Sequence, residues 1–167
     1  MSGRAWVFGD NVDTDALAPG HAIRLPIEEL SRHCLESIDP DFAASVAAGD
    51  FVVAGANFGI GSSREQAAEA LRHLGVAAVI ARSFGGIFFR NAFNLGLPAL
   101  VSADTGRIAV GDRLELDLDG GRIVDTDQDT TIDCAPVAPA LRQLIADGGL
   151  VGHLEKRLAA ATGETST

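Results

Sequence analysis

The sequence lacks the residues and segments on which several common classes of protein depend. Its 167 residues contain two cysteines, Cys34 and Cys134, which lie far apart and form no Cys-x-x-Cys pair. Neither a zinc ribbon nor a disulfide framework is therefore expected. No run approaches the roughly 20 apolar residues of a membrane helix, and the N-terminus has no apolar segment typical of a signal peptide. These absences predict a cytoplasmic protein with reduced cysteines and no membrane partner.

Basic residues are also scarce. The chain has 13 lysines and arginines against 23 aspartates and glutamates, which gives a formal net charge of −10. A field of this sign disfavours nucleic acid as a partner. It does not exclude a small anionic substrate, because local groups outweigh distant charges that salt screens over about 10 Å. The one lysine, Lys156, lies far from any glycine-rich loop, which excludes a P-loop.

Apolar runs and helical patterns alternate through the middle of the chain. Residues 51–54, 76–81 and 99–101 are continuous apolar runs, typical of strands that are buried on both faces. Helical patterns over 67–74 and 87–95 separate them, and a glycine ends each pattern. This succession predicts parallel strands joined by helical crossovers.

The two ends of the chain have different patterns. Residues 6–8 predict a strand, and residues 26–35 predict a helix with a proline in its first turn. Alternating leucines from Leu114 predict an antiparallel hairpin around Gly120-Gly121, and residues 139–158 predict a helical region with a possible break at two further glycines.

These patterns together predict the fold class. We expect one α/β domain over residues 1–160, with a mostly parallel sheet flanked by helices and an appended antiparallel hairpin. Residues 161–167 are expected to form a disordered tail.

The segment GIGSSRE, residues 59–65, is the strongest candidate for a functional site. It joins a predicted strand to a predicted helix, where unpaired N–H groups attract anions and glycines allow a ligand to approach the backbone. Arg64 adds a guanidinium suited to a carboxylate or phosphate. The structural alternative is a capping box, which Ser62-x-x-Glu65 matches, but capping does not require an arginine.

Common motifs do not account for this segment. A dinucleotide fingerprint would need glycine where Arg64 stands, and the serine-hydrolase motif Gly-x-Ser-x-Gly is absent. A serine beside a carboxylate-binding arginine fits abstraction of a proton next to a carboxylate. Held by backbone donors and a cation, a serine alkoxide can act as the base.

Three segments carry a family resemblance: GANFGIGSSRE from residue 55, GDNVDTDALAPG from residue 9, and AVIARSFGGIFFRNAFNLGLPAL from residue 78. Their order and spacing, from about residue 9 to residue 100, resemble the swivelling β/β/α-type domain of the aconitase superfamily. The closest likeness is to the compact, archaeal-type branch of small subunits that serve 3-isopropylmalate dehydratase and homoaconitase.

The resemblance implies roles for five residues. Ser62 would be the catalytic base, Arg64 and Ser63 would bind a substrate carboxylate, and Asp15 would lie at the active-site face. Arg24 belongs to the loop 21–25, which would select the substrate. Without the resemblance, we would interpret Asp15 as a turn or helix-cap residue and Arg24 as a solvated surface arginine.

The resemblance also implies a reaction that needs a second chain. The expected activity is a hydro-lyase that isomerises 2-isopropylmalate and 3-isopropylmalate in leucine biosynthesis by dehydration and rehydration. A [4Fe–4S] cluster would sit on a separate large subunit, because this chain has no set of cysteine ligands. By itself the chain would be inactive, and it could form a homodimer.

Two departures from the family pattern leave the substrate open. Gln66 stands where many members have histidine, and Ala22-Ile23-Arg24-Leu25 replaces a Tyr-Leu-Arg-Thr-like stretch. Homoaconitate, 2,3-dimethylmalate and citrate are alternative substrates, and a non-catalytic anion-binding module is the alternative function. The spacing of the four histidines predicts no metal site, and the acidic hairpin lacks the ligand order of a calcium loop.

Overall fold

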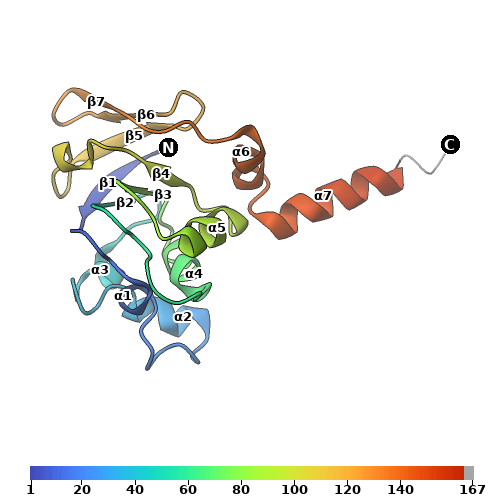
Figure 1. Ribbon diagram of the computed structural model, residues 1–167, viewed down its shortest axis with the longest axis horizontal. Helices are drawn as coiled ribbons and strands as arrows, with labels where there is room; N and C mark the ends of the chain where they lie inside the picture. The colour runs from blue at the N-terminus through green and yellow to red at the C-terminus, as the bar shows by residue number, and fades with distance from the viewer. Residues whose placement is uncertain (164–167) are drawn as a thin grey trace.

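The computed structural model describes residues 1–163 (Figure 1). Within this range the strands form one seven-stranded sheet in the order β4-β3-β2-β1-β5-β6-β7. The central strand β1 (Ser2–Val7) pairs in parallel with β2 (Phe51–Ala54) and antiparallel with β5 (Arg113–Asp117). Strand β1 therefore joins a parallel half of the sheet to an antiparallel half.

The parallel half contains the predicted alternation of strands and helices. Strand β2 is followed by α4 (Gln66–His73), β3 (Ala78–Ala81), α5 (Gly86–Asn94) and β4 (Ala99–Val101). All three strands pair in parallel, which confirms the prediction for this part of the chain. In Figure 1 the helices lie on one side of these strands.

The antiparallel half covers the other side of the parallel strands (Figure 1). Strands β5, β6 (Arg122–Asp125) and β7 (Thr130–Asp133) form a meander, so the predicted hairpin is confirmed and extended by a strand that the sequence analysis did not predict. The four residues of β7 carry a single buried side chain, Ile132, which is too short a pattern to recognise.

The curl of the sheet produces two apolar cores and explains the all-apolar strands. Phe51 and Val53 of β2 pack in the core that contains Leu114 and Ile123 of the antiparallel half. Val52, between them, faces the core lined by the helices. Alternate residues of a strand point to opposite faces, so both sets must be apolar.

One predicted helix is shorter than expected. Instead of a helix over residues 26–35, the chain forms α2 (Ile27–Leu30) and a 3-10 turn η1 (Ser31–His33). Leu35 adopts a left-handed conformation with φ of 62°, and its N–H donates to the carbonyl oxygen of Ala16 at 2.8 Å. This tertiary hydrogen bond ends the helical turn. Because its two residues are distant in the sequence, no local pattern predicts it.

The C-terminal region is helical, with the break that was expected. Helix α6 (Pro139–Ala146) is separated from α7 (Leu150–Gly163) by Gly148 and Gly149, both with positive φ, and α7 projects from the body of the molecule (Figure 1). The helix includes residues 161–163, which were expected to belong to the tail, because the preceding alanines favour helix. Residues 164–167 of the expected tail lie outside the described residues. The other short helical segments are α1 (Thr14–Leu17), α3 (Phe42–Ser45) and η2 (Thr105–Arg107).

Among the described residues, no helix combines the length and apolar character needed to cross a membrane.

Candidate functional site

Two loops meet at the carboxyl ends of β1 and β2 and bring the sequence motifs together. The loop after β1 and the loop after β2 are joined by backbone hydrogen bonds: Asn11 N–H to Ala56 O at 2.8 Å and Gly59 N–H to Val12 O at 2.7 Å. A third bond joins Thr14 N–H to Ile60 O at 2.8 Å. The Asp-Thr-Asp segment and the Gly-Ser-Ser-Arg segment therefore form one surface.

Ser62 lies against Thr14, which is 48 residues earlier in the chain. The backbone N–H of Ser62 donates to Thr14 Oγ1 at 3.1 Å, and the two hydroxyl oxygens are 3.3 Å apart. Thr14 is 2% exposed, whereas Ser62 is exposed. The buried hydroxyl of Thr14 thus lies against the accessible hydroxyl of Ser62. The sequence analysis missed Thr14, since nothing in its local pattern marks it.

The glycines of the turn make this approach possible. Gly61 has φ of +116°, and a Cβ placed there would lie 2.8 Å from Thr14 Oγ1. Gly59 has φ of +74°, and a Cβ there would lie 2.2 Å from Cγ of Phe88. Gly61 thus makes room for Thr14, and Gly59 makes room for an aromatic ring of α5. That these glycines also allow a ligand to approach the backbone stays a prediction.

The capping alternative for the serines does not occur. Helix α4 begins at Gln66, its N-cap residue is Glu65, and no side-chain capping bond is made. Ser63 is exposed and makes no hydrogen bond within residues 1–163. The serines therefore stand outside the helix, with their side chains open to a ligand.

Arg64 and Asp15 form an ion pair across the two loops. Nη1 of Arg64 contacts Oδ1 of Asp15 and donates to the carbonyl oxygen of Ala18 at 2.9 Å. The helix-cap role considered for Asp15 belongs to Asp13, whose carboxylate accepts the N–H of Ala16 at 2.8 Å. The remaining donors of Arg64 make no hydrogen bond to the described residues, and its side chain is 26% exposed. One side of the guanidinium is thus fixed and the other can bind an anion.

Arg24 is not connected to this group. It is exposed, and within residues 1–163 no hydrogen bond or ion pair links it to Ser62, Arg64 or Asp15. The structure thus brings four of the five predicted residues to one pair of loops and leaves Arg24 on the segment between α1 and α2.

A second polar group borders the same loops and was missed from the sequence. Asp10 accepts the N–H of Ala56 at 2.8 Å and pairs with Arg82, and these two interactions lower the pKa of Asp10. Asn57 donates through Nδ2 to Asn11 Oδ1 at 2.9 Å, and both asparagines have positive φ. These residues follow β1, β2 and β3 directly, and polar residues just after parallel strands are the signal that could have found them.

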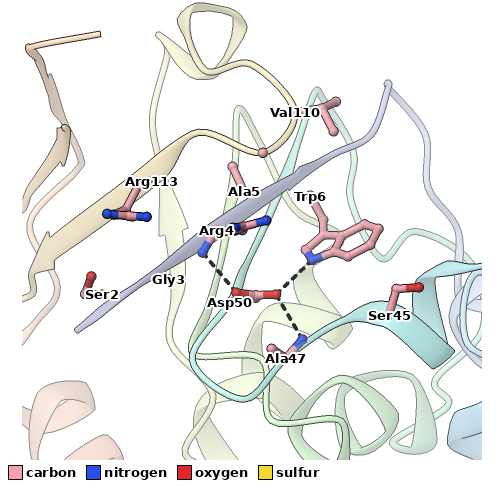
Figure 2. A pocket seen from close by; sticks show the side chains of 11 residues that line it. Ser2, Gly3, Arg4, Ala5, Trp6, Ser45, Ala47, Asp50, Val110 and Arg113 are labelled. Carbon is pink, nitrogen blue, oxygen red and sulfur yellow. Dashed lines mark hydrogen bonds between the residues drawn. The ribbon is translucent and has the colours of Figure 1, made fainter. Parts of the chain in front are cut away.

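One pocket, of about 480 Å³, adjoins this site, and its lining includes Asp13, Asp15, Pro19, Ser37 and Ile38. A second pocket, of about 410 Å³, lies along β1 from Ser2 to Trp6 (Figure 2).

The pocket along β1 offers no free carboxylate. Asp50 accepts hydrogen bonds from Arg4 N–H at 2.9 Å, Trp6 Nε1 at 3.0 Å and Ala47 N–H at 2.9 Å (Figure 2). Burial raises the pKa of Asp50, but these hydrogen bonds outweigh burial and lower it. Asp50 therefore ties β1 to the segment before β2 and is structural.

The cysteines do not suit an iron–sulfur cluster. Cys34 and Cys134 are both buried. Burial raises the pKa of Cys34 far above its ordinary value, and burial with a contribution from Asp133 raises that of Cys134 to about 11. Cluster ligands are thiolates, which these environments disfavour.

A different group of side chains could hold a metal ion. His21, His33 and Glu36 have ligand atoms that all lie within 4.8 Å of one another. The spacing of the four histidines along the sequence predicts no metal site, because spacing does not show which segments meet in the fold. The fold brings His21 to the other two residues from a separate segment.

Comparisons with known proteins show which family this chain resembles. Residues 32–104 match the family described as the aconitase C-terminal domain. A 3-isopropylmalate dehydratase small subunit from Syntrophus aciditrophicus is 46% identical over 159 residues, which are 94% of this chain and 97% of that protein. A methanogen homoaconitase small subunit from Methanocaldococcus jannaschii is 49% identical over 158 residues, which are 94% and 92% of the two chains.

A solved structure confirms the fold. The crystal structure of 3-isopropylmalate dehydratase from Methanocaldococcus jannaschii superposes with a TM-score of 0.93 at 46% sequence identity and covers 98% of each chain. The sheet and its flanking helices are therefore those of the aconitase swivelling domain. Because the curated relatives match over nearly their whole length, the chain belongs to the family of 3-isopropylmalate dehydratase small subunits.

Proposed function

We propose that this chain is the small subunit of a hydro-lyase that interconverts 2-isopropylmalate and 3-isopropylmalate in leucine biosynthesis. The observation that carries the proposal is the contact between two hydroxyl groups in a chain of this family. The hydroxyl oxygen of Ser62 lies 3.3 Å from that of Thr14, on the same two loops as the Arg64–Asp15 ion pair. A base next to a carboxylate-binding cation is what dehydration of a hydroxy diacid requires.

Ser62 acts as the base in this proposal. Its alkoxide removes a proton from the carbon next to a carboxylate, the electron pair forms the double bond, and hydroxide leaves from the neighbouring carbon. Rehydration returns the proton from Ser62 Oγ while hydroxyl adds to the other carbon. The Thr14 hydroxyl, 3.3 Å from Ser62 Oγ, can donate to the alkoxide and stabilise it.

Arg64 and Ser63 bind the substrate carboxylate. Asp15 and the carbonyl oxygen of Ala18 hold Nη1, which fixes the plane of the guanidinium and directs its free donors outward. A planar, permanently charged group of this kind suits a carboxylate through two parallel hydrogen bonds.

A partner chain completes the site. A [4Fe–4S] cluster on the large subunit would supply a Lewis acid for the leaving hydroxyl. Small subunits of this family are named as parts of a larger enzyme. Exposed apolar side chains on the projecting helix α7, Val151 at 71% and Leu154 at 47%, support a role in an assembly. Pairing with itself in the absence of the large subunit stays a prediction.

A second substrate is supported by one observation. The methanogen homoaconitase small subunit is as similar to this chain as the 3-isopropylmalate dehydratase subunits are. The segment 21–25 with Arg24, which we propose selects the substrate, therefore decides between a branched alkyl group and a third carboxylate.

The test reconstitutes the enzyme anaerobically with its cluster-loaded large subunit and follows 2-isopropylmaleate by absorbance. We expect activity in the mixture, none in either subunit alone, and a loss of several orders of magnitude with Ser62→Ala. Ser45→Ala, an exposed serine on α3, is the matched control and should keep full activity.

The other outcomes separate the alternatives. Turnover of homoaconitate, dimethylmaleate or cis-aconitate, but not of 2-isopropylmaleate, would keep the mechanism and change the substrate. Normal turnover by Ser62→Ala would refute Ser62 as the base. Anion binding by the isolated chain with no turnover of any of these acids would favour the non-catalytic module.

A further inference from the structure

Two imidazoles face one carboxylate on the segment that runs from the end of α1 to the turn after η1. Nε2 of His21 lies 3.1 Å from Oε1 of Glu36, and Nδ1 of His33 lies 2.7 Å from Oε2. The two rings meet edge to face with centroids 5.1 Å apart. Each carboxylate oxygen therefore has its own imidazole, and one ligand atom from each of the three residues lies within 4.8 Å of the other two.

We propose that His21, His33 and Glu36 form a binding site for a divalent transition-metal ion, with Zn²⁺ as the best match. Imidazole nitrogen and carboxylate oxygen are borderline ligands that suit zinc, and two histidines with one glutamate and water complete a tetrahedral site. Metal–ligand bonds of about 2.0–2.2 Å at tetrahedral angles place the ligand atoms about 3.3 Å apart.

The observed spacing needs little change to meet this geometry. The two nitrogen–oxygen distances, 3.1 Å and 2.7 Å, involve different oxygens of Glu36, and one ligand atom from each residue lies within 4.8 Å of the others. Small rotations of the side chains would bring three such atoms to that separation. The side chains can adjust, since that of His21 is 63% exposed and those of His33 and Glu36 are each 35% exposed. The net charge of −10 favours a cation over the whole surface.

A metal here would fix one loop against another. His21 begins the segment 21–25, whereas His33 and Glu36 belong to the turn that ends η1. The carbonyl oxygen of Ala16, next to Asp15, accepts the N–H of Leu35 at 2.8 Å, so this turn is already joined to the candidate active-site loop. Bound metal would therefore hold the segment that carries Arg24 at a set distance from the Asp15–Arg64 pair.

The histidine on α7 offers an internal control. Nδ1 of His153 lies 2.7 Å from Asp147, in a pair that has no second imidazole and that Lys156 also contacts, at 2.6 Å from the other oxygen. The ammonium group repels a metal ion. This pair should bind Zn²⁺ much more weakly than the group of His21, His33 and Glu36.

The experiment titrates Zn²⁺ into the untagged chain at pH 7.5 and follows binding by calorimetry and by competition with a chromogenic chelator. We expect one ion per chain. His21→Gln and Glu36→Gln should each weaken binding at least tenfold, the lower bound of what even an outer-shell partner costs. His153→Gln should leave the affinity unchanged.

One further measurement makes the result decisive. X-ray absorption of the zinc-loaded chain should show two imidazole ligands. No binding at 100 μM Zn²⁺, or binding that His21→Gln leaves intact, would overturn the proposal. Binding is measured on the isolated chain, so its failure is independent of the catalytic proposal, which only the reconstituted enzyme tests.

Discussion

Replacing Thr14 with valine tests whether the buried hydroxyl supports the base. Valine keeps the shape of the side chain but removes the oxygen that lies 3.3 Å from Ser62 Oγ and 3.1 Å from Ser62 N. In the proposed mechanism this oxygen donates to the alkoxide, so the loss acts on the transition state more than on substrate binding. The expected change is in kcat, with KM little altered.

The magnitude follows from the geometry. One preorganised donor to a developing charge is worth about 10²–10³ in kcat. The separation of 3.3 Å exceeds the usual distance between hydroxyl oxygens, so we expect a smaller loss than this, about 10–100-fold, or about 1.4–2.7 kcal/mol of barrier. The free energy of unfolding should change by at most about 1 kcal/mol. Ser62 is exposed, so water can accept the hydrogen bond that its N–H no longer donates to Thr14.

The assay is steady-state turnover by the reconstituted enzyme, with denaturant unfolding of the isolated chain in parallel. Thr14→Ser keeps the hydroxyl without the methyl group and should recover most of kcat. Wild-type kcat in Thr14→Val, or an equal loss in Thr14→Ser, would refute the role assigned to the hydroxyl. A large loss of stability would show that Thr14 serves the fold instead.

Two further predictions concern stability, measured by denaturant unfolding of the isolated chain. Gly59→Ala should cost about 2–5 kcal/mol, because positive φ and contact with Phe88 both penalise a Cβ, whereas Gly86→Ala should be nearly neutral since a Cβ there meets nothing within 4 Å. Asp50→Asn should cost about 1–3 kcal/mol at pH 7. Folding lowers the pKa of Asp50, so its contribution to the free energy of unfolding is fully present above the unfolded pKa near 3.8 and is lost as the pH falls through the folded pKa. The stability difference between the wild type and Asp50→Asn should therefore close in acid. An equal penalty in both glycine variants, or an Asp50→Asn penalty that does not narrow as the pH falls below 3.8, would contradict these accounts.

Much of the fold could be predicted because its signals are local. The run 51–54 reads as a doubly buried strand from its four apolar residues alone, and the structure buries all of them. Gly75 and Gly148 end helices where predicted, since each adopts a positive φ that other residues avoid. The antiparallel half was only partly predicted, because the four residues of β7 are too few to show a period.

Residues of the candidate site were predicted where a sequence motif contains them. They were missed where their place in the site depends on a tertiary contact. Arg64 stands out because helix capping does not require an arginine, and Ser62 stands out because it lies beside Arg64 in the family motif. Thr14 and Arg82 do not, since each meets its partner, Ser62 or Asp10, only when segments distant in the sequence come together in the fold.

The sequence by itself determined the alternation of strands and helices, the glycine-rich turn and the family, because each is written in short segments of residue types. Tertiary structure alone decided which side chains face one another: Thr14 with Ser62, Asp15 with Arg64, and His21 with Glu36. It also decided that the missing side chain at Gly61 makes room for Thr14. The physical reason is that a side chain's partner depends on strand order and loop path, which are fixed when the sheet assembles and leave no local pattern.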